Sequence, residues 1–366
     1  MPFLSTERSK AALYRLLAAA PIGSYTEEAA AGSSGDNMSE KPESTIGELG
    51  KQGMGRFTGV QTFMRAPYQP DLEGVDIALA GIPFDFQGGR GSAKQGPSQV
   101  RQMSGLIRRV SFDGVSPFDL CRVADIGDAV LNPMSPRVSQ DLAAEFVGRV
   151  ADRGGALVAV GGDHGTTYPI LKGLVRNGPV GLIHFDAHPD TYDDPYGGYI
   201  HHGNAIRAAI EEGLVDPKRT ISLGIRGTRF MSTDRDYHAQ HGMRLLTIND
   251  VIELGITETV AEIRRVVGDG PTYITFDIDA LDPPYAIGTG APEPDGLSMR
   301  EALAILRGLK GLDIIGGDVM EVAPPLDPSG HTALNAANIM FEIICAIALA
   351  RVSKCGIAGN GARHEV

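Results

Sequence analysis

The stretch GLIHFDAHPD, residues 181–190, places ionisable side chains directly after a short apolar run. Asp186, His188 and Asp190 occupy every second position, and residues two apart in an extended chain point the same way. Several carboxylates held side by side cannot all stay ionised in a buried place unless a cation compensates them. The stretch therefore predicts a buried strand that ends in a metal-binding cluster.

The sequence on both sides of this stretch alternates apolar, β-branched runs with helical patterns. The runs are apolar on both faces, which is typical of a parallel sheet covered by helices on both sides. We expect one α/β domain over residues 56–366. Its predicted strands lie at residues 75–81, 156–162, 180–185, 220–225, 244–248, 272–276 and 314–320.

Three positions carry signals for helix ends. Ser298 and Glu301 have the spacing of a capping box at the start of a helix. Gly268 follows an apolar helical pattern and is predicted to end that helix. Ser139 is predicted to be the N-cap of a helix that covers residues 139–155.

The beginning of the chain has a different composition. Residues 28–54 are rich in Ala, Gly, Ser, Glu and Lys and contain almost no bulky apolar residue. Such a segment buries too little surface to offset the entropy lost on ordering. We expect residues 1–55 to form a partly disordered N-terminal extension, with a short helix before a mobile linker.

The bulk composition excludes several classes of protein. The 366-residue chain has a net charge of −12 and no basic stripe, which argues against a nucleic-acid partner. No apolar run reaches the roughly 18 residues of a membrane span, so residues 338–350 are predicted to be a buried helix. The three cysteines lack metal-like spacing and fit a reducing compartment. Without a secretory pattern, the predicted location is cytoplasmic.

Polar residues follow several of the predicted strands, and ligands of open α/β sheets bind beyond the carboxyl ends of strands. Six residues could hold metal, and they are too many for one small ion with a reactive water. Two metals about 3.5–4 Å apart fit this number. Oxygen and nitrogen ligands without sulfur suit Mn²⁺, with Ni²⁺, Co²⁺, Zn²⁺ or Fe²⁺ as competitors. The candidate ligands are His164, Asp186, His188, Asp190, Asp277 and Asp279.

Each of these motifs also has a simpler interpretation. An Asp-x-Asp sequence after a strand more often caps a turn, as Asp163 could also do, and His164 could be a hydrogen-bonded core histidine. The occurrence of three such motifs at predicted strand ends favours the metal site.

The blocks GGDHG, DAHPD, TFDIDALDP and DVMEVAPPLDPSGHTALNAANI resemble the signature sequences of the ureohydrolases, the arginase and agmatinase superfamily. The agmatinase-like branch is the most similar, and the resemblance extends from about residue 58 to the C-terminus. It implies an arginase-like three-layer α/β/α fold with a central, mostly parallel sheet, and a centre of two Mn²⁺ ions. One metal would be held by His164, Asp186, Asp190 and Asp277, and the other by Asp186, His188, Asp277 and Asp279. Asp186, Asp277 and a hydroxide would bridge the two.

The same resemblance implies an enzyme, a hydrolase of C–N bonds in linear amidines. Metal-bound hydroxide would attack a guanidinium carbon, releasing urea and an amine. Glu321 would orient the guanidinium group, and His202 would transfer protons. We expect no role for His201, nor for His238 and His241, which lie in a predicted polar loop.

The sequence departs from the family pattern at the rim of the pocket, so the substrate stays open. Agmatine, a substrate in polyamine metabolism, carries an ammonium tail that could pair with Asp295. Guanidinobutyrate or guanidinopropionate would need a basic partner, such as Arg90, Lys94 or Arg229. A small or substituted guanidine would need no tail pocket and could use nickel. The predicted substrate contacts are Asn204, Asp295 and Glu321.

Two further interpretations remain. A formiminoglutamase-like amidine hydrolase would share the metal ligands but release formamide. A catalytically silent subunit of a hetero-oligomer, or a metal-binding regulator, would be expected to lack some ligands, whereas all six are present. The expected partners are a small guanidino substrate and further copies of the chain, in a trimer or hexamer.

Overall fold

The structure of the chain is a computed structural model that describes residues 56, 58–86, 92–194, 198 and 200–354. The chain divides into two units, Met1–Lys41 and Pro42–Val366, and all described residues belong to the second. The predicted N-terminal extension lies outside the described residues.

An eight-stranded sheet forms the centre of the second unit, and every pair of neighbouring strands is parallel. The seven predicted strands are confirmed. An additional strand at one edge, Val123–Asp128, has no counterpart in the predicted set. The strands in spatial order are β2 (Val123–Asp128), β1 (Ile77–Ile82), β3 (Ala156–Gly161), β8 (Ile314–Met320), β7 (Thr272–Asp277), β4 (Val180–Phe185), β5 (Val215–Ile225) and β6 (Arg244–Thr247).

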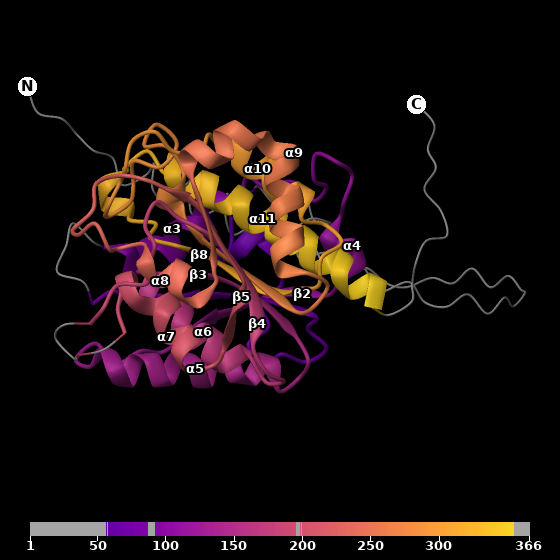
Figure 1. Ribbon diagram of the computed structural model, residues 1–366. Helices are drawn as coiled ribbons and strands as arrows, with labels where there is room; N and C mark the ends of the chain where they lie inside the picture. Colours follow the sequence, from indigo (N-terminus) through magenta and orange to yellow (C-terminus); the bar gives the residue numbers. More distant parts are fainter. Residues whose placement is uncertain (1–55, 57, 87–91, 195–197, 199, 355–366) are drawn as a thin grey trace, which may run out of the picture. The chain divides into compact units, whose positions relative to one another are not determined.

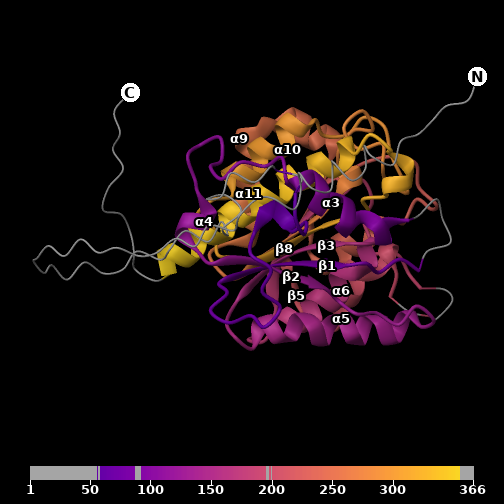
Figure 2. The same ribbon diagram turned by 180° about the vertical axis from the view of Figure 1, so that it is seen from behind.

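Helices cover both faces of this sheet, as the doubly apolar strands predict. Figure 1 shows one layer of helices below the sheet and another above it, and Figure 2 shows the same layers from behind. The lower layer contains α5 (Pro136–Ala151), α6 (Thr167–Leu174) and α7 (Ala205–Glu211). The upper layer contains α3 (Gly96–Ser104), α9 (Ile248–Val267), α10 (Met299–Gly308) and α11 (His331–Lys354). The predicted three-layer α/β/α class is confirmed.

The remaining helical segments are short and lie in the connections. They are α4 (Pro117–Leu120), α8 (Asp236–His241) and the 3₁₀ turns η1 (Phe63–Arg65), η2 (Ala93–Gln95), η3 (His164–Thr166), η4 (His202–Asn204), η5 (Ile278–Ala280) and η6 (Pro324–Leu326).

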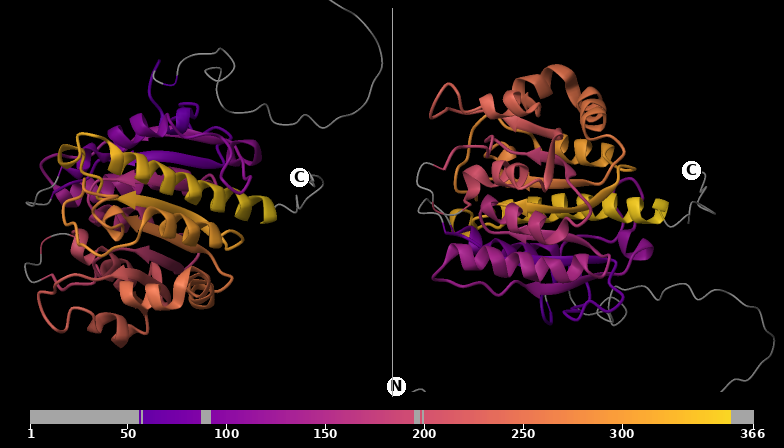
Figure 3. Two further views of the ribbon diagram at one scale, coloured as in Figure 1. Left: turned by 90° about the horizontal axis from the view of Figure 1, so that it is seen from above. Right: turned by 60° about the horizontal axis from the view of Figure 1, so that its bottom comes forward.

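Helix α11 lies across one face of the sheet, as Figure 3 shows from above. Its length and its mean hydropathy of 1.8 would suit a membrane span, but 83% of that apolar window is buried. The prediction of a buried helix is therefore confirmed. Cys345 on this helix and Cys121 are buried and form no disulfide.

Two of the three predicted helix ends are confirmed. Ser298 and Glu301 form a reciprocal capping box at the start of α10, and Gly268 is the C-cap of α9. The prediction for Ser139 is wrong, because α5 begins earlier with Ser135 as N-cap. The Ser139 hydroxyl instead donates to the carbonyl of Asn132 from inside the helix.

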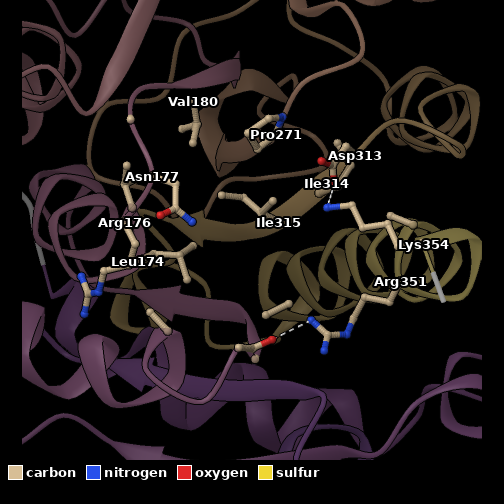
Figure 4. Close-up of a pocket in the computed structure, with 17 residues that line it drawn as sticks. Leu174, Arg176, Asn177, Val180, Pro271, Asp313, Ile314, Ile315, Arg351 and Lys354 are labelled. Carbon is tan, nitrogen blue, oxygen red and sulfur yellow. Dashed lines mark hydrogen bonds and ion pairs between the residues drawn. The ribbon is translucent and has the colours of Figure 1, made fainter.

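A cavity of about 610 Å³ lies at the amino ends of the central strands. Figure 4 shows that two of its cationic side chains, Lys354 and Arg351, already have partners. The Lys354 ammonium lies 2.6 Å from the Asp313 carboxylate, and the Arg351 guanidinium donates to the Gly154 carbonyl. These pairs connect α11 to the segments that precede β8 and β3, so they serve the packing of this helix.

Candidate metal centre

The candidate ligands gather at the carboxyl edge because of the strand order. The strands β3, β8, β7 and β4 are consecutive neighbours and all run in the same direction. The residues that follow them therefore emerge at one edge of the sheet. His164 follows β3, Asp186 follows β4, Asp277 ends β7 and Glu321 follows β8.

His164 lies at the centre of the cluster. Its side chain is fully buried, and its Nδ1 atom has no hydrogen-bond partner. That nitrogen nevertheless lies 3.0 Å from Asp186 Oδ2, 3.2 Å from Asp190 Oδ2 and 3.0 Å from Asp277 Oδ2. An unpartnered buried nitrogen that faces three carboxylates has the arrangement that a divalent cation would satisfy.

A second group lies on the other side of Asp186. His188 Nδ1 is 3.1 Å from Asp279 Oδ2 and 3.5 Å from Asp186 Oδ1. Asp186 thus belongs to both groups, one oxygen facing each. Asp277 directs Oδ2 to His164 and accepts the Asp279 N–H with Oδ1. Two ligand groups that share a carboxylate are compatible with a binuclear metal centre.

The charges of the cluster lead to the same conclusion. Burial, followed by repulsion from Asp279 and Asp186, raises the pKa of Asp277 well above its ordinary value. Despite their burial, His164 and His188 have a raised pKa because carboxylates surround them. The metal-free cluster must therefore share protons among its carboxylates and imidazoles. Divalent cations would supply this positive charge instead.

Buried polar residues behind the candidate ligands hydrogen-bond to them. These residues were not predicted from the sequence. His164 Nε2 lies 2.7 Å from the Thr275 hydroxyl, which in turn donates to the buried Asp318. His184 Nε2 lies 2.8 Å from Asp186 Oδ2. The signal for His184 was present, since it extends the period-two series of Asp186 and His188 by one step backwards. Thr275 and Asp318 gave no such signal, because each lies within an apolar strand.

Glu321 lies beside the cluster in a strained backbone conformation, with φ at 63°. Its Oε1 accepts the backbone N–H of His164 at 2.9 Å. Burial, then the charges of Asp277 and Asp163, raise the pKa of its carboxyl group well above the ordinary value. A cation bound nearby would be stabilised by this carboxylate, and strained residues of this kind concentrate at functional sites.

The turn η4 carries His202 and Asn204. The His202 side chain is exposed to solvent. Desolvation by the surrounding atoms and repulsion from His201 lower the pKa of His202 to about 4, so this imidazole is neutral at neutral pH. Asn204 is buried, and its side-chain oxygen accepts the His201 N–H in a capping box.

The loop with Asp295 brings a different carboxylate to the cluster. Asp295 is exposed, with a left-handed φ of 65°. The carboxylate of Glu293, two residues earlier, lies 3.9 Å from His188 Nε2. Arg226 holds this loop by donating to the carbonyls of Glu293 and Pro294. Glu293 was not among our predicted site residues, and its sequence PEP gave no sign of it.

The other residues considered from the sequence have clear positions. Lys94 and Arg229 are exposed, and Arg90 lies outside the described residues. The prediction that His238 and His241 occupy a polar loop is wrong. Both belong to helix α8, and His238 is only 2% exposed.

Comparison with known proteins agrees with this geometry. The Arginase family model matches residues 75–346. Guanidinopropionase of Pseudomonas aeruginosa is 45% identical over 298 residues, which cover 80% of this chain and 93% of that protein. The mitochondrial guanidino acid hydrolase of Homo sapiens is 41% identical over 80% of this chain and 84% of its own length.

A solved structure supports the same assignment. The proclavaminate amidino hydrolase of Streptomyces clavuligerus superposes with a TM-score of 0.78 at 38% identity, covering 81% of this chain and 99% of that one. The family match spans most of the chain and contains all six candidate metal ligands. On this evidence, the chain belongs to the arginase family.

Proposed function

We propose that this chain is a binuclear-metal hydrolase that cleaves a guanidino compound to urea and an amine. The observation that carries the proposal is the buried, unpartnered Nδ1 of His164 within 3.2 Å of three carboxylates. Relatives named for guanidino hydrolysis support the substrate class, because they align with this chain over about four fifths of its length.

The residues that would hold the metals are those of the two groups. His164, Asp186, Asp190 and Asp277 would bind one ion, and Asp186, His188, Asp277 and Asp279 the other. When bound, such a pair of cations lowers the pKa of a water molecule and supplies a nucleophile at neutral pH. We propose Mn²⁺ for both positions, with Ni²⁺ as competitor, because the groups contain oxygen and nitrogen atoms but no sulfur.

Glu321 and His202 would serve the substrate. The Glu321 carboxylate would accept N–H groups of the guanidinium and fix its plane against the cluster. Its rigid position comes from the bond that it accepts from His164 N–H. His202 is exposed and its ring is neutral near pH 7; because its pKa is low, the protonated ring would give a proton readily to the leaving amine.

The tail of the substrate decides between two subclasses. An ammonium tail, as in agmatine, would be attracted by Asp295 and Glu293. A carboxylate tail would be attracted by Arg229 or Lys94. The names guanidinopropionase, guanidino acid hydrolase and guanidinobutyrase among the relatives favour the carboxylate tail. Relatives named agmatinase, of comparable sequence identity, support the ammonium tail as the second candidate. We propose Asn204 and Asp295 as rim residues for either tail.

Two further expectations belong to this proposal. We propose a homo-oligomer, trimeric or hexameric, in the cytoplasm. Bacterial relatives support the location, although other relatives are named as mitochondrial. Light scattering of the purified chain would determine the oligomeric state directly.

A substrate panel tests the proposed function. Purified protein reconstituted with Mn²⁺ or Ni²⁺ would be given agmatine, guanidinobutyrate, guanidinopropionate, methylguanidine and formiminoglutamate. We expect urea from at least one guanidino compound and no formamide. Formamide from the last compound would instead identify an amidine hydrolase. Urea from none of them, with well under one metal bound per chain, would favour a catalytically silent subunit.

A further inference from the structure

We propose that His184, Ser222, His238 and Thr191 form a buried hydrogen-bond chain that positions Asp186 for metal binding. His184 Nε2 lies 2.8 Å from Asp186 Oδ2, and His184 Nδ1 lies 3.0 Å from the Ser222 hydroxyl. That hydroxyl lies 3.0 Å from His238 Nε2, and His238 Nδ1 lies 3.5 Å from the Thr191 hydroxyl. The inference rests on the proposed metal centre and assigns these four as positioning residues.

Counting protons gives this hydrogen-bond chain one direction when both imidazoles are neutral. The Asp186 carboxylate can only accept, so His184 must carry its proton on Nε2. His184 Nδ1 is then an acceptor and takes the single Ser222 proton. The Ser222 oxygen must therefore accept from His238 Nε2–H, which leaves His238 Nδ1 to accept from Thr191. Every proton in this order is used once.

The surroundings maintain this order. His184 and Ser222 are fully buried, and His238 and Thr191 are each 2% exposed. Burial lowers the pKa of His238 to about 3, in agreement with the neutral ring that the count requires. A buried polar group that loses its partner is costly, so the members depend on one another.

The hydrogen-bond chain connects two candidate ligands, Asp186 and Asp190. Its far end, Thr191, directly follows Asp190, while Asp186 is its near end. Ser222 comes from β5 and His238 from α8. The loop that carries the ligands is thus fixed at both ends by side chains outside it. This explains why a histidine is buried in α8, far along the sequence from the cluster.

His184 could alternatively be a ligand itself, because it lies within the His164, Asp186 and Asp190 group. Both of its ring nitrogens already have partners, however, and Nε2 points at a carboxylate oxygen rather than past it. Outer partners of this kind orient ligands, and their loss usually weakens metal affinity about 10–100-fold. We therefore expect His184 to act through Asp186.

The test compares two substitutions of buried serines by alanine. Ser222→Ala breaks the chain, whereas Ser139→Ala removes a buried hydroxyl that bonds to the Asn132 carbonyl elsewhere. Mn²⁺ affinity would be measured by competition with a chromogenic chelator on the full chain. We expect about a 10–100-fold loss for Ser222→Ala and less than about 3-fold for Ser139→Ala. Equal affinity of Ser222→Ala and wild type would overturn the inference.

A second pair of variants distinguishes the loss of a hydrogen bond from a general folding defect. His238→Gln keeps a donor N–H toward Ser222, whereas His238→Leu removes it at similar volume. We expect the glutamine variant to retain most of the metal affinity and the leucine variant to match Ser222→Ala. Equal losses in both variants, with unchanged thermal unfolding, would contradict a role through the donated hydrogen bond.

A spectroscopic measurement is independent of the metals. The ¹⁵N shifts of His238 in the metal-free protein should report a neutral ring with the proton on Nε2. A proton on Nδ1 alone would show that Ser222 donates to His238 and not to His184, which would overturn the proposed donor order. Urea release is measured separately, so a protein that binds metal with the expected variant pattern but hydrolyses nothing would refute only the proposed function.

Discussion

Asp186 joins the two halves of the cluster, because one of its oxygens faces His164 and the other faces His188. Asp279 has a narrower position, facing His188 while its other oxygen accepts the Ala187 N–H. Neighbouring carboxylates in one cluster therefore have unequal importance, and variants of single residues should separate them.

The first prediction concerns Asp277 and Asp279. Asp277→Asn should weaken both metals and lower urea release more than about 100-fold, since loss of a bridging ligand should exceed the effect of an outer partner. Asp279→Asn should remove mainly one metal. Elemental analysis of both purified variants and the wild type gives the measurement. The same metal content in all three proteins would contradict the assignment.

The second prediction concerns protons and metals at the same residues. Despite burial, the surrounding carboxylates raise the pKa of His164 and His188 in the folded, metal-free state, which favours the protonated rings. A metal must displace these protons, so its affinity should rise as the pH increases toward the raised values. Calorimetric titrations with Mn²⁺ in buffers of different ionisation enthalpy should show proton release. Heats that do not depend on the buffer would refute this competition.

At this scale, the sequence predicted the residues that repeat with a strand period and follow an apolar run. Asp186 and His188 are such residues, and the structure brings them together with His164. The residues that it did not predict reach the cluster from elsewhere. Ser222 lies inside β5 and His238 in a helix, so only the folded chain places them beside His184.

At the scale of elements, close backbone contacts set the positions of the strand ends. A Cβ atom on Gly162 would lie 1.6 Å from the carbonyl oxygen of Phe84, so only glycine fits where β3 turns toward His164. The GGDHG motif is thus needed for packing as well as for its ligand. Asp163 in the same motif caps the turn η3, as its simpler interpretation proposed.

The ends of helices were predictable where two signals coincide. Ser298 had both its own type and the spacing to Glu301, and the prediction was confirmed. The N-cap predicted at Ser139 lies at Ser135 instead, and Pro136 after it suits the first position of a helix. The proline was the stronger signal, because its fixed φ favours helix initiation.

The third prediction concerns the connection between two loops. Arg226 is 7% exposed and donates to the carbonyls of Asp279 and Leu281 in one loop and of Glu293 in another. Arg226→Met leaves these acceptors without their donor and should lower the free energy of unfolding by about 2–4 kcal/mol. Urea denaturation followed by circular dichroism measures this change.

The control for this change is Arg265→Met. Arg265 pairs with Glu262 on the exposed surface of α9, where solvent screens the pair, so its removal should lower the free energy of unfolding far less than Arg226→Met does. If both variants lose the same stability, the carbonyls around Arg226 do not depend on its guanidinium group.

At the scale of the whole molecule, the alternation of strands and helices predicted the fold class, but not the order of the strands. Consecutive parallel strands can pair with either neighbour, so the order β3-β8-β7-β4 comes from the packing of helices on both faces. The missed strand β2 shows a second limit. It lies at an edge, ends in Gly127 and Asp128, and buries Asp125 against Arg101. A short strand with polar residues lacks the continuous apolar run that marked the others.

The strand order also decides how metal removal should affect stability. The six candidate ligands follow three strands from the middle of the sheet, β3, β4 and β7, and come from segments far apart in the sequence. Cations bound there hold these strand ends together only in the folded state, so they stabilise it by mass action. At 100 times its Kd, one such ion adds about 2.7 kcal/mol. Removal of both ions should therefore lower the free energy of unfolding by about twice this amount.

The fourth prediction is therefore a drop in Tm on chelation. A change of 1 kcal/mol shifts Tm by roughly 2–4 °C in domains approaching this size, so the loss of about 5.4 kcal/mol from two ions should lower Tm by about 10–20 °C. Differential scanning calorimetry with Mn²⁺ and with excess chelator measures it. The Asp277→Asn variant should already unfold near the lower temperature and respond little to the chelator. If excess chelator leaves the Tm of the wild-type protein unchanged, bound metal does not stabilise the carboxyl edge of the sheet.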